Sequence, residues 1–266
     1  MNIGVCSWAF AGILRGNRPI TEMARLAKEA GFSFLEGAFH PRGCLGSEEP
    51  PTNCALPVPV RSLATLLLHR FNLTEPRPQR RAHALKIVRG MLDCAKEWGI
   101  SSISFSPGAF YPGQGLVDIL EGLAPQLRCL IDEAAQAGCR IALENLPNHC
   151  LVTREAMALA LTYLGPEVCV CLDIGNALLD PPVTSWIKEF HSRIIKIHLS
   201  DGTVRNEAFN PALPGKGEVP WREVRKEVES IRDQVDLFVE APLPVGTSET
   251  LFLQELRQAV QTVWQK

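Results

Sequence analysis

The 266-residue sequence contains no run of Lys and Arg, no apolar stretch of membrane-spanning length and no Cys-x-x-Cys pair. Its formal net charge is −2 at pH 7, so its charge pattern does not favour a nucleic-acid partner. The first residues, from Met1 to Trp8, lack the positive flank and long apolar region of a secretory signal peptide. We therefore expect a cytoplasmic protein that binds neither nucleic acid nor membranes.

Nine cysteines occur in a chain without a secretion signal, so we expect them to remain reduced. Cys169 and Cys171 flank Val170 and would share one face of a strand, which is not the spacing of a redox or zinc pair. We interpret the cysteines as small, mostly buried hydrophobic residues.

Strand-like and helix-like segments alternate along the whole chain. Strands are predicted over residues 2–7, 33–36, 62–68, 100–106, 141–144, 168–173, 193–199 and 235–240. Helices are predicted over residues 20–30, 77–98, 116–137, 154–164, 186–190, 221–231 and 248–264. No linker divides the chain, and the Pro-rich residues 50–59 read as a long loop. We predict an α/β fold, a single-domain (β/α)8 TIM barrel over residues 1–266, in preference to two smaller domains.

Four of the predicted strands end in a residue that can bind a metal ion. These residues are Glu144, Asp173, His198 and Glu240. Because the carboxyl ends of the strands of such a barrel meet at one face, we expect the four side chains to converge. A carboxylate is costly to bury unless it is paired or holds a cation. Three carboxylates and one imidazole predict a site for one divalent metal ion: Mn, Mg, Co, Fe or Zn.

Several segments carry these residues in a recognisable order: Ile141-Ala-Leu-Glu-Asn145, Leu172-Asp-Ile-Gly-Asn176, Ile197-His-Leu-Ser-Asp201, Pro214-Gly-Lys-Gly-Glu-Val-Pro-Trp221 and Val239-Glu240. They resemble the motifs of the xylose-isomerase-like barrel superfamily, which contains sugar and sugar-phosphate isomerases and epimerases as well as endonuclease IV. The resemblance covers most of the chain and is strongest between Ile141 and Pro242.

This resemblance implies a divalent-metal-dependent isomerase or epimerase of a small polyhydroxylated carbonyl compound. In the epimerase branch, one glutamate removes a proton beside a carbonyl and a second glutamate returns it, through a metal-stabilised enediolate. These roles fall on Glu144 and Glu240, which would also bind the metal, with Asp173 and His198 as structural ligands.

Three alternatives stay open. A dehydratase or lyase of the inosose or dehydroshikimate type begins with the same proton abstraction. An endonuclease IV-like phosphodiesterase needs further histidines, whereas Asn176 stands where that branch has His and the chain has only six His. A non-catalytic barrel could bind a sugar-like ligand, although it need not keep four such groups. We also expect that the protein could form a homo-oligomer.

Five residues are candidate substrate contacts: Trp8, His69, Asn176, Arg205 and Lys216. Trp8 could stack on the apolar face of a sugar. Arg205 follows His198 by seven residues and could clamp an oxygen-rich group. Lys216 stands between glycines where the superfamily often has Glu. The sequence therefore predicts a substrate that carries an acidic group near Arg205 and Lys216.

Other polar residues have open roles. Glu36 would bind a ligand or a site residue, or form an ion pair inside the barrel mouth. Lys196 alternates with His198 and would pair with Glu240 or a ligand. His149 is a candidate substrate contact, and Trp221 is interpreted as an anchor at the start of a helix.

Overall fold

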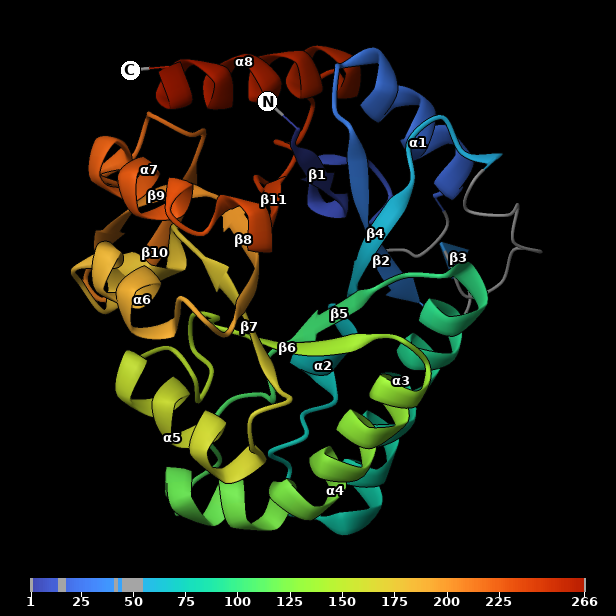
Figure 1. The fold of residues 1–266 in the computed structure, drawn as a ribbon, viewed down its shortest axis with the longest axis vertical. Coiled ribbons are helices and arrows are strands. Elements are labelled where there is room, and N and C mark those ends of the chain that lie inside the picture. The colour runs from blue at the N-terminus through green and yellow to red at the C-terminus, as the bar shows by residue number, and fades with distance from the viewer. Residues whose placement is uncertain (1, 14–17, 41–42, 45–54, 266) are drawn as a thin grey trace.

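The computed structural model describes residues 2–13, 18–40, 43–44 and 55–265. Eight parallel strands form a closed barrel at the centre of the molecule (Figure 1). In barrel order they are β1 (Gly4–Cys6), β2 (Phe34–His40), β4 (Val60–Ala64), β5 (Ser102–Phe105), β6 (Arg140–Glu144), β7 (Cys169–Asp173), β8 (Ile194–Leu199) and β11 (Asp236–Val239). The barrel closes because β1 pairs with both β2 and β11. The predicted single-domain (β/α)8 barrel is confirmed.

In the described part of the chain, seven helices of at least two turns surround the barrel, each after a barrel strand, as the sequence predicted (Figure 1). They are α1 (Ile20–Glu29), α3 (Pro78–Trp98), α4 (Leu116–Gln136), α5 (Arg154–Leu164), α6 (Val183–Phe190), α7 (Trp221–Glu229) and α8 (Glu249–Gln265). Between β2 and β4 the described residues contain no α-helix, and β2 instead pairs with the short antiparallel β3 (Gly43–Cys44). Residues 50–54 of the predicted Pro-rich loop lie outside the described residues.

The segment 62–68, predicted as a strand, changes conformation half-way. Strand β4 ends at Ala64, and the one-turn helix α2 (Leu67–Arg70) follows. Thr65 makes this turn, because its hydroxyl donates to the Phe39 carbonyl and accepts from the Leu67 N–H. His69 therefore lies on a helix at the rim of the barrel.

A β-hairpin that the sequence analysis missed follows β8. It consists of β9 (Asp201–Arg205) and β10 (Ala208–Ala212), paired antiparallel. Its turn residues, Asn206 and Glu207, both have positive φ angles, of 51° and 62°. The usual sequence signal for such a turn is Asn-Gly, and Glu207 in place of glycine hides it.

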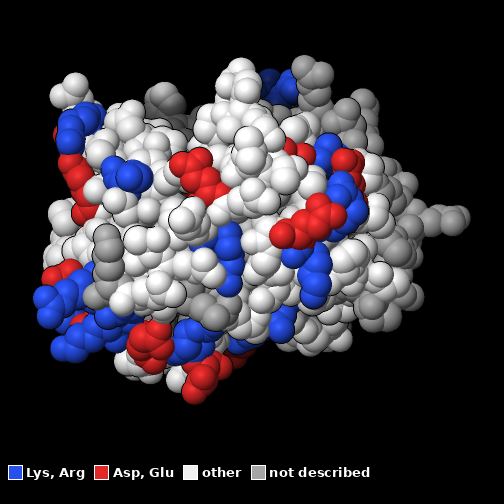
Figure 2. All heavy atoms as spheres, turned by 90° about the horizontal axis from the view of Figure 1, so that it is seen from above, with Lys and Arg blue, Asp and Glu red and all other residues white. Residues whose placement is uncertain are grey.

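Apolar side chains fill the space between strands and helices, as parallel strands buried on both faces require. Within the described residues, no helix is long and apolar enough to cross a membrane. Figure 2 shows Lys and Arg side chains interspersed with Asp and Glu side chains across the face that it draws.

The loop Pro214–Trp221 wraps around one buried carboxylate, that of Asp201. This carboxylate accepts hydrogen bonds from four backbone N–H groups, of Gly202, Gly215, Gly217 and Val219, and from the Trp221 indole. A Cβ at Gly217 would collide with this carboxylate, which explains the glycine. Trp221 starts α7, so the predicted helix-start anchor is confirmed.

Replacing Asp201 by Ala should lower the free energy of unfolding by about 3 kcal/mol or more, because it leaves several buried donors unpaired. Trp221→Phe removes only one of these donors and should cost about 1 kcal/mol. Urea unfolding of both variants measures the two values. Equal effects of the two substitutions would contradict this account of the loop.

Candidate metal and substrate site

The structure brings together the four residues that the sequence selected as metal ligands. Glu144 and Asp173 are the last residues of β6 and β7, His198 is the last but one of β8, and Glu240 directly follows β11. One potential ligand atom from each lies within 4.8 Å of those of the other three. Strand ends separated by dozens of residues thus converge at the carboxyl face of the barrel.

The His198 ring lies between two groups of carboxylates. Its Nδ1 is 2.8 Å from Glu240 Oε2, 3.3 Å from Glu144 Oε1 and 3.9 Å from Asp173 Oδ2. Its Nε2 lies 2.8 Å from Glu36 Oε2 on the opposite edge. A proton on Nε2 that is donated to Glu36 leaves the Nδ1 lone pair directed at the cluster, as a metal ligand requires.

Asp173 is held by backbone and side-chain donors. Its Oδ1 accepts from the Asn176 N–H and the Ser200 hydroxyl, both at 2.6 Å, and its Oδ2 faces His198. The Asn145 side chain binds both the N–H and the carbonyl of Asp173 across the two strands. No role was predicted for Asn145, although its place directly after Glu144 in the motif was a usable signal.

Burial and the neighbouring acidic groups shift the pKa values of Asp173 and His198. Burial raises the pKa of Asp173 to about 8, and the neighbouring charges of Glu240 and Glu144 add to this increase. Burial alone would lower the pKa of His198, but the surrounding acidic groups, Cys171, Cys6 and Glu36 first among them, raise it well above its usual value. Both shifts show that the clustered carboxylates favour a positive charge among them.

These features fit a divalent cation. Three carboxylates and one imidazole suit the oxygen- and nitrogen-binding metals. Buried Glu240 Oε2 accepts no hydrogen bond from the described residues and lies 2.8 Å from His198 Nδ1, so these two atoms face each other as potential metal ligands. The thiols of Cys6 and Cys171 also lie near His198, but burial raises the pKa of both, and thiols are poor metal ligands.

A buried ion pair supports His198 from below. Lys196, two residues before His198 on β8, pairs with Glu36 and donates to the hydroxyls of Ser62 and Ser104. Lys196 and His198 hold the pKa of Glu36 well below its usual range, although burial acts to raise it. The expected pairing of Lys196 with Glu240 or a ligand is wrong, because its position deeper in the barrel brings its ammonium group to Glu36.

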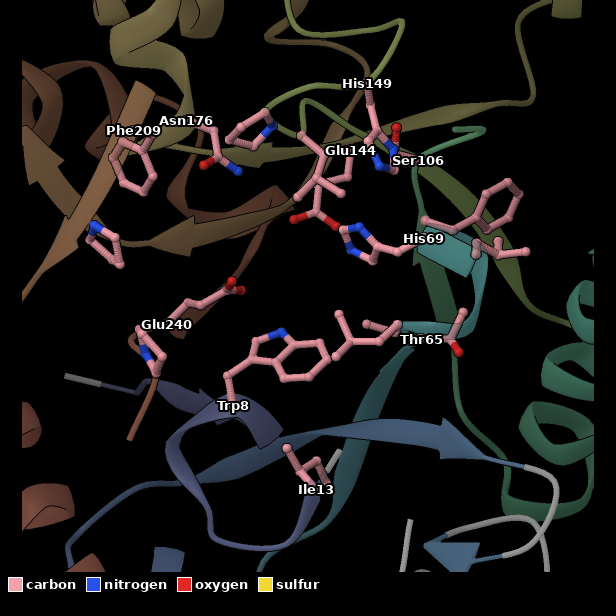
Figure 3. A pocket seen from close by; sticks show the side chains of 18 of the residues that line it. Trp8, Ile13, Thr65, His69, Ser106, Glu144, His149, Asn176, Phe209 and Glu240 are labelled. Atoms are coloured by element: carbon pink, nitrogen blue, oxygen red, sulfur yellow. The ribbon is translucent and has the colours of Figure 1, made fainter. Parts of the chain in front are cut away.

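A cavity of about 550 Å³ opens above the cluster (Figure 3). Glu144 and Glu240 line it, whereas Asp173 and His198 are not among its lining residues. Trp8, His69 and Asn176, all predicted substrate contacts, line it as well. Further lining residues, for which the sequence predicted no contact, include Ile13, Thr65, Leu66, Ser106 and Phe209.

Arg205 and Lys216 lie away from this cavity, which corrects their assignment as substrate contacts. Arg205 ends β9, where the hairpin carries its guanidinium to an ion pair with Glu218 at 2.6 Å, and its side chain is 63% exposed. Lys216 is exposed in the loop that Asp201 organises. The missed hairpin is the reason for the position of Arg205, since this residue ends its first strand.

Two histidines meet in the cavity wall. The rings of His69 and His149 lie edge to face, with 4.8 Å between their centroids. Burial lowers the pKa of His149 to about 4, with a further contribution from His69. Burial also lowers the pKa of His69, although the charge of Glu144 opposes this. The location of His149 above the site agrees with its interpretation as a candidate substrate contact.

The sequence profile of the xylose isomerase-like TIM barrel family matches residues 18–258. No curated protein sequence matches the chain significantly. The solved structure of the IOLI protein with a binding zinc atom is similar with a TM-score of 0.81 and 16% identity, over 99% of this chain and 98% of that one. The structure of L-ribulose 3-epimerase is similar with a TM-score of 0.77 and 15% identity, over 100% of this chain and 95% of that one. The structure of the probable 3-DHS dehydratase AsbF from Bacillus anthracis is similar with a TM-score of 0.76 and 15% identity, over 98% of this chain and 99% of that one.

The buried pair predicts strong coupling between Glu36 and Lys196. Glu36→Gln or Lys196→Met alone should each lower the free energy of unfolding by about 3–5 kcal/mol, because the partner is left as an unpaired buried charge. The double variant should lose clearly less than the sum. Urea unfolding of the two single variants and the double variant measures this double-mutant cycle.

The same cycle on the partly exposed pair Arg61–Asp236 is the control and should give a coupling energy below about 1 kcal/mol. Additive effects at Glu36 and Lys196 would contradict the prediction.

Proposed function

The chain belongs to the xylose isomerase-like TIM barrel family, and we propose that it is a divalent-metal-dependent isomerase or epimerase of a small sugar or sugar-like carbonyl compound. One observation carries this proposal: of the four clustered residues, only the two glutamates line the cavity. Side chains that transfer protons to and from a substrate must reach it, whereas residues that only hold a metal need not.

The four clustered residues, Glu144, Asp173, His198 and Glu240, would hold the metal ion. A bound divalent ion would stabilise the negative charge that develops on substrate oxygens when a neighbouring carbon loses a proton. Asp173 and His198 are nearly fully buried and fixed by Asn145, Ser200 and Glu36, which suits ligands that keep their geometry.

Glu144 and Glu240 would be the acid–base pair. They come from β6 and the end of β11, between which β7 and β8 lie in the barrel. In Figure 3 their carboxylates enter the cavity from different sides. A substrate carbon between them can lose a proton to one carboxylate and receive a proton from the other.

The solved structures that resemble this chain include an epimerase and a probable dehydratase, so they support carbonyl chemistry without deciding the reaction. A dehydratase would begin with the same proton abstraction. Among the described residues, each metal-capable cluster contains a single histidine, His198, which supports an isomerase over a phosphodiesterase that needs several.

Asp173→Ala and His198→Ala should abolish stoichiometric binding of a divalent metal, since each removes a buried ligand. Metal content after dialysis against Mn²⁺, Co²⁺ or Zn²⁺, and the accompanying shift in thermal unfolding temperature, measure this. The control is Glu218→Ala, an exposed carboxylate outside the site, which should bind metal normally. Unchanged metal binding by both site variants would refute the metal assignment.

Glu144→Gln and Glu240→Gln should each slow turnover by about 10²–10⁴-fold, because glutamine keeps an oxygen ligand but cannot accept the proton. Exchange of a substrate C–H proton in deuterated water, followed by NMR, detects the abstraction before the product is known. For an epimerase, each variant should still exchange deuterium into one epimer and fail with the other. Full activity of both variants would refute the two-glutamate mechanism.

A further inference from the structure

One wall of the cavity carries buried polar atoms that have no hydrogen-bond partner among the described residues. Ser106 Oγ and His149 Nδ1 are buried and form no hydrogen bond with the described residues. The two residues are only 4% and 7% exposed, and both line the cavity, beside His69. Figure 3 shows these three side chains gathered next to Glu144. Unpaired buried polar atoms are unfavourable, so their position at a cavity wall indicates a ligand that pairs with them.

These groups suit hydroxyl groups of a substrate. A hydroxyl and a histidine ring can each donate or accept a hydrogen bond, as a substrate hydroxyl also can. His69, His149 and Ser106, which we call the polar wall, therefore match the hydroxyl-bearing part of a sugar. Their place beside Glu144 would bring these hydroxyls close to the carbon that reacts.

The rest of the cavity is mostly apolar. Its lining includes Trp8, Phe10, Ile13, Leu66, Phe209 and Leu243. In Figure 3, Trp8 and Ile13 lie across the cavity from the polar wall. Its volume of about 550 Å³ lies within the range of sites that bind drug-sized ligands. An apolar substituent on the substrate would remove this surface from water.

The charged side chains in the described part of the cavity lining are acidic. None of the described residues that line the cavity is Lys or Arg, and Arg205 and Lys216 lie elsewhere. The charged groups that line it are the carboxylates of Glu144 and Glu240. A phosphate or carboxylate group placed against this lining, away from the metal ligands, would lose its hydration without gaining a counter-charge from the described lining residues.

We propose that the substrate is an uncharged polyhydroxylated carbonyl compound with an apolar substituent, such as a keto sugar that carries an alkyl or aryl group. Its hydroxyls bind His69, His149 and Ser106, and its substituent packs against Trp8 and the other apolar lining residues. This inference rests on the proposed function. It replaces the sequence-based expectation of an acidic group near Arg205 and Lys216.

The test compares four compound classes with the metal-loaded full chain: a free ketose, an aryl keto-glycoside, a ketose phosphate and a dehydroshikimate-type keto acid. Solvent deuterium exchange gives kcat/KM for each. The aryl compound should exceed the free ketose by about 10- to 100-fold, the gain expected from burying an aromatic group. The phosphate and the keto acid should react more slowly than the free ketose. A preference for either anion overturns the inference but leaves the proposed function standing, whereas exchange with none of the four refutes the proposed function.

Variants make the test independent of overall activity. Ser106→Ala and His149→Asn should raise KM for the neutral compounds several-fold while leaving metal content unchanged. Leu243→Lys introduces a cation into the lining and should improve the reaction of the ketose phosphate at least tenfold relative to the aryl compound. Leu251→Lys, at a position 65% exposed outside the cavity, is the matched control and should leave this ratio unchanged. An unchanged ratio in Leu243→Lys, or unchanged KM values in both polar-wall variants, overturns the inference.

Calorimetry with the slow Glu240→Gln variant provides a reading without turnover. This variant, loaded with metal, should bind the aryl compound more tightly than the ketose phosphate. Equal affinity for both, or tighter binding of the phosphate, contradicts the inference.

Discussion

The contact on which the site depends is the hydrogen bond between Glu36 and the Nε2 edge of His198. It turns the Nδ1 edge toward Glu144, Asp173 and Glu240, so that one ring nitrogen faces three carboxylates. Glu36 is itself nearly fully buried, and a carboxylate there is tolerable only because Lys196 neutralises it. The orientation of His198 at the barrel mouth therefore depends on the buried Glu36–Lys196 ion pair below it.

The four clustered residues divide into two pairs, one buried beneath the cavity and one that lines it. Asp173 and His198 are the buried pair, and neighbouring strands fix their positions. Glu144 and Glu240 reach from the same cluster into the cavity. Residues held rigidly below and residues exposed to a ligand above are what metal-assisted proton transfer needs, because the ligand geometry stays fixed while the carboxylates meet the substrate. In the proposed substrate complex, the polar wall and the apolar lining of the cavity would contribute selectivity.

Much of the fold and the cluster was predictable from local patterns. Apolar runs ending in Glu144, Asp173 and Glu240 gave both the strands and their carboxyl ends, and the barrel rule then implied convergence. The hairpin after β8 was not predictable, since Glu207 adopts a turn conformation that glycine usually signals. That single error misplaced Arg205, because a residue's distance along the chain from His198 does not reveal the direction in which a hairpin projects it.

By itself, the sequence determined which residues can bind a metal and which strands present them, since these properties depend on residue type and local periodicity. Only the tertiary structure decided the partners: Lys196 with Glu36 rather than Glu240, and His149 beside His69 in the cavity wall. The physical reason is that side-chain partners from distant segments depend on depth along the barrel axis and on the register of neighbouring strands. The alternation of apolar and polar residues along one strand indicates neither that depth nor that register.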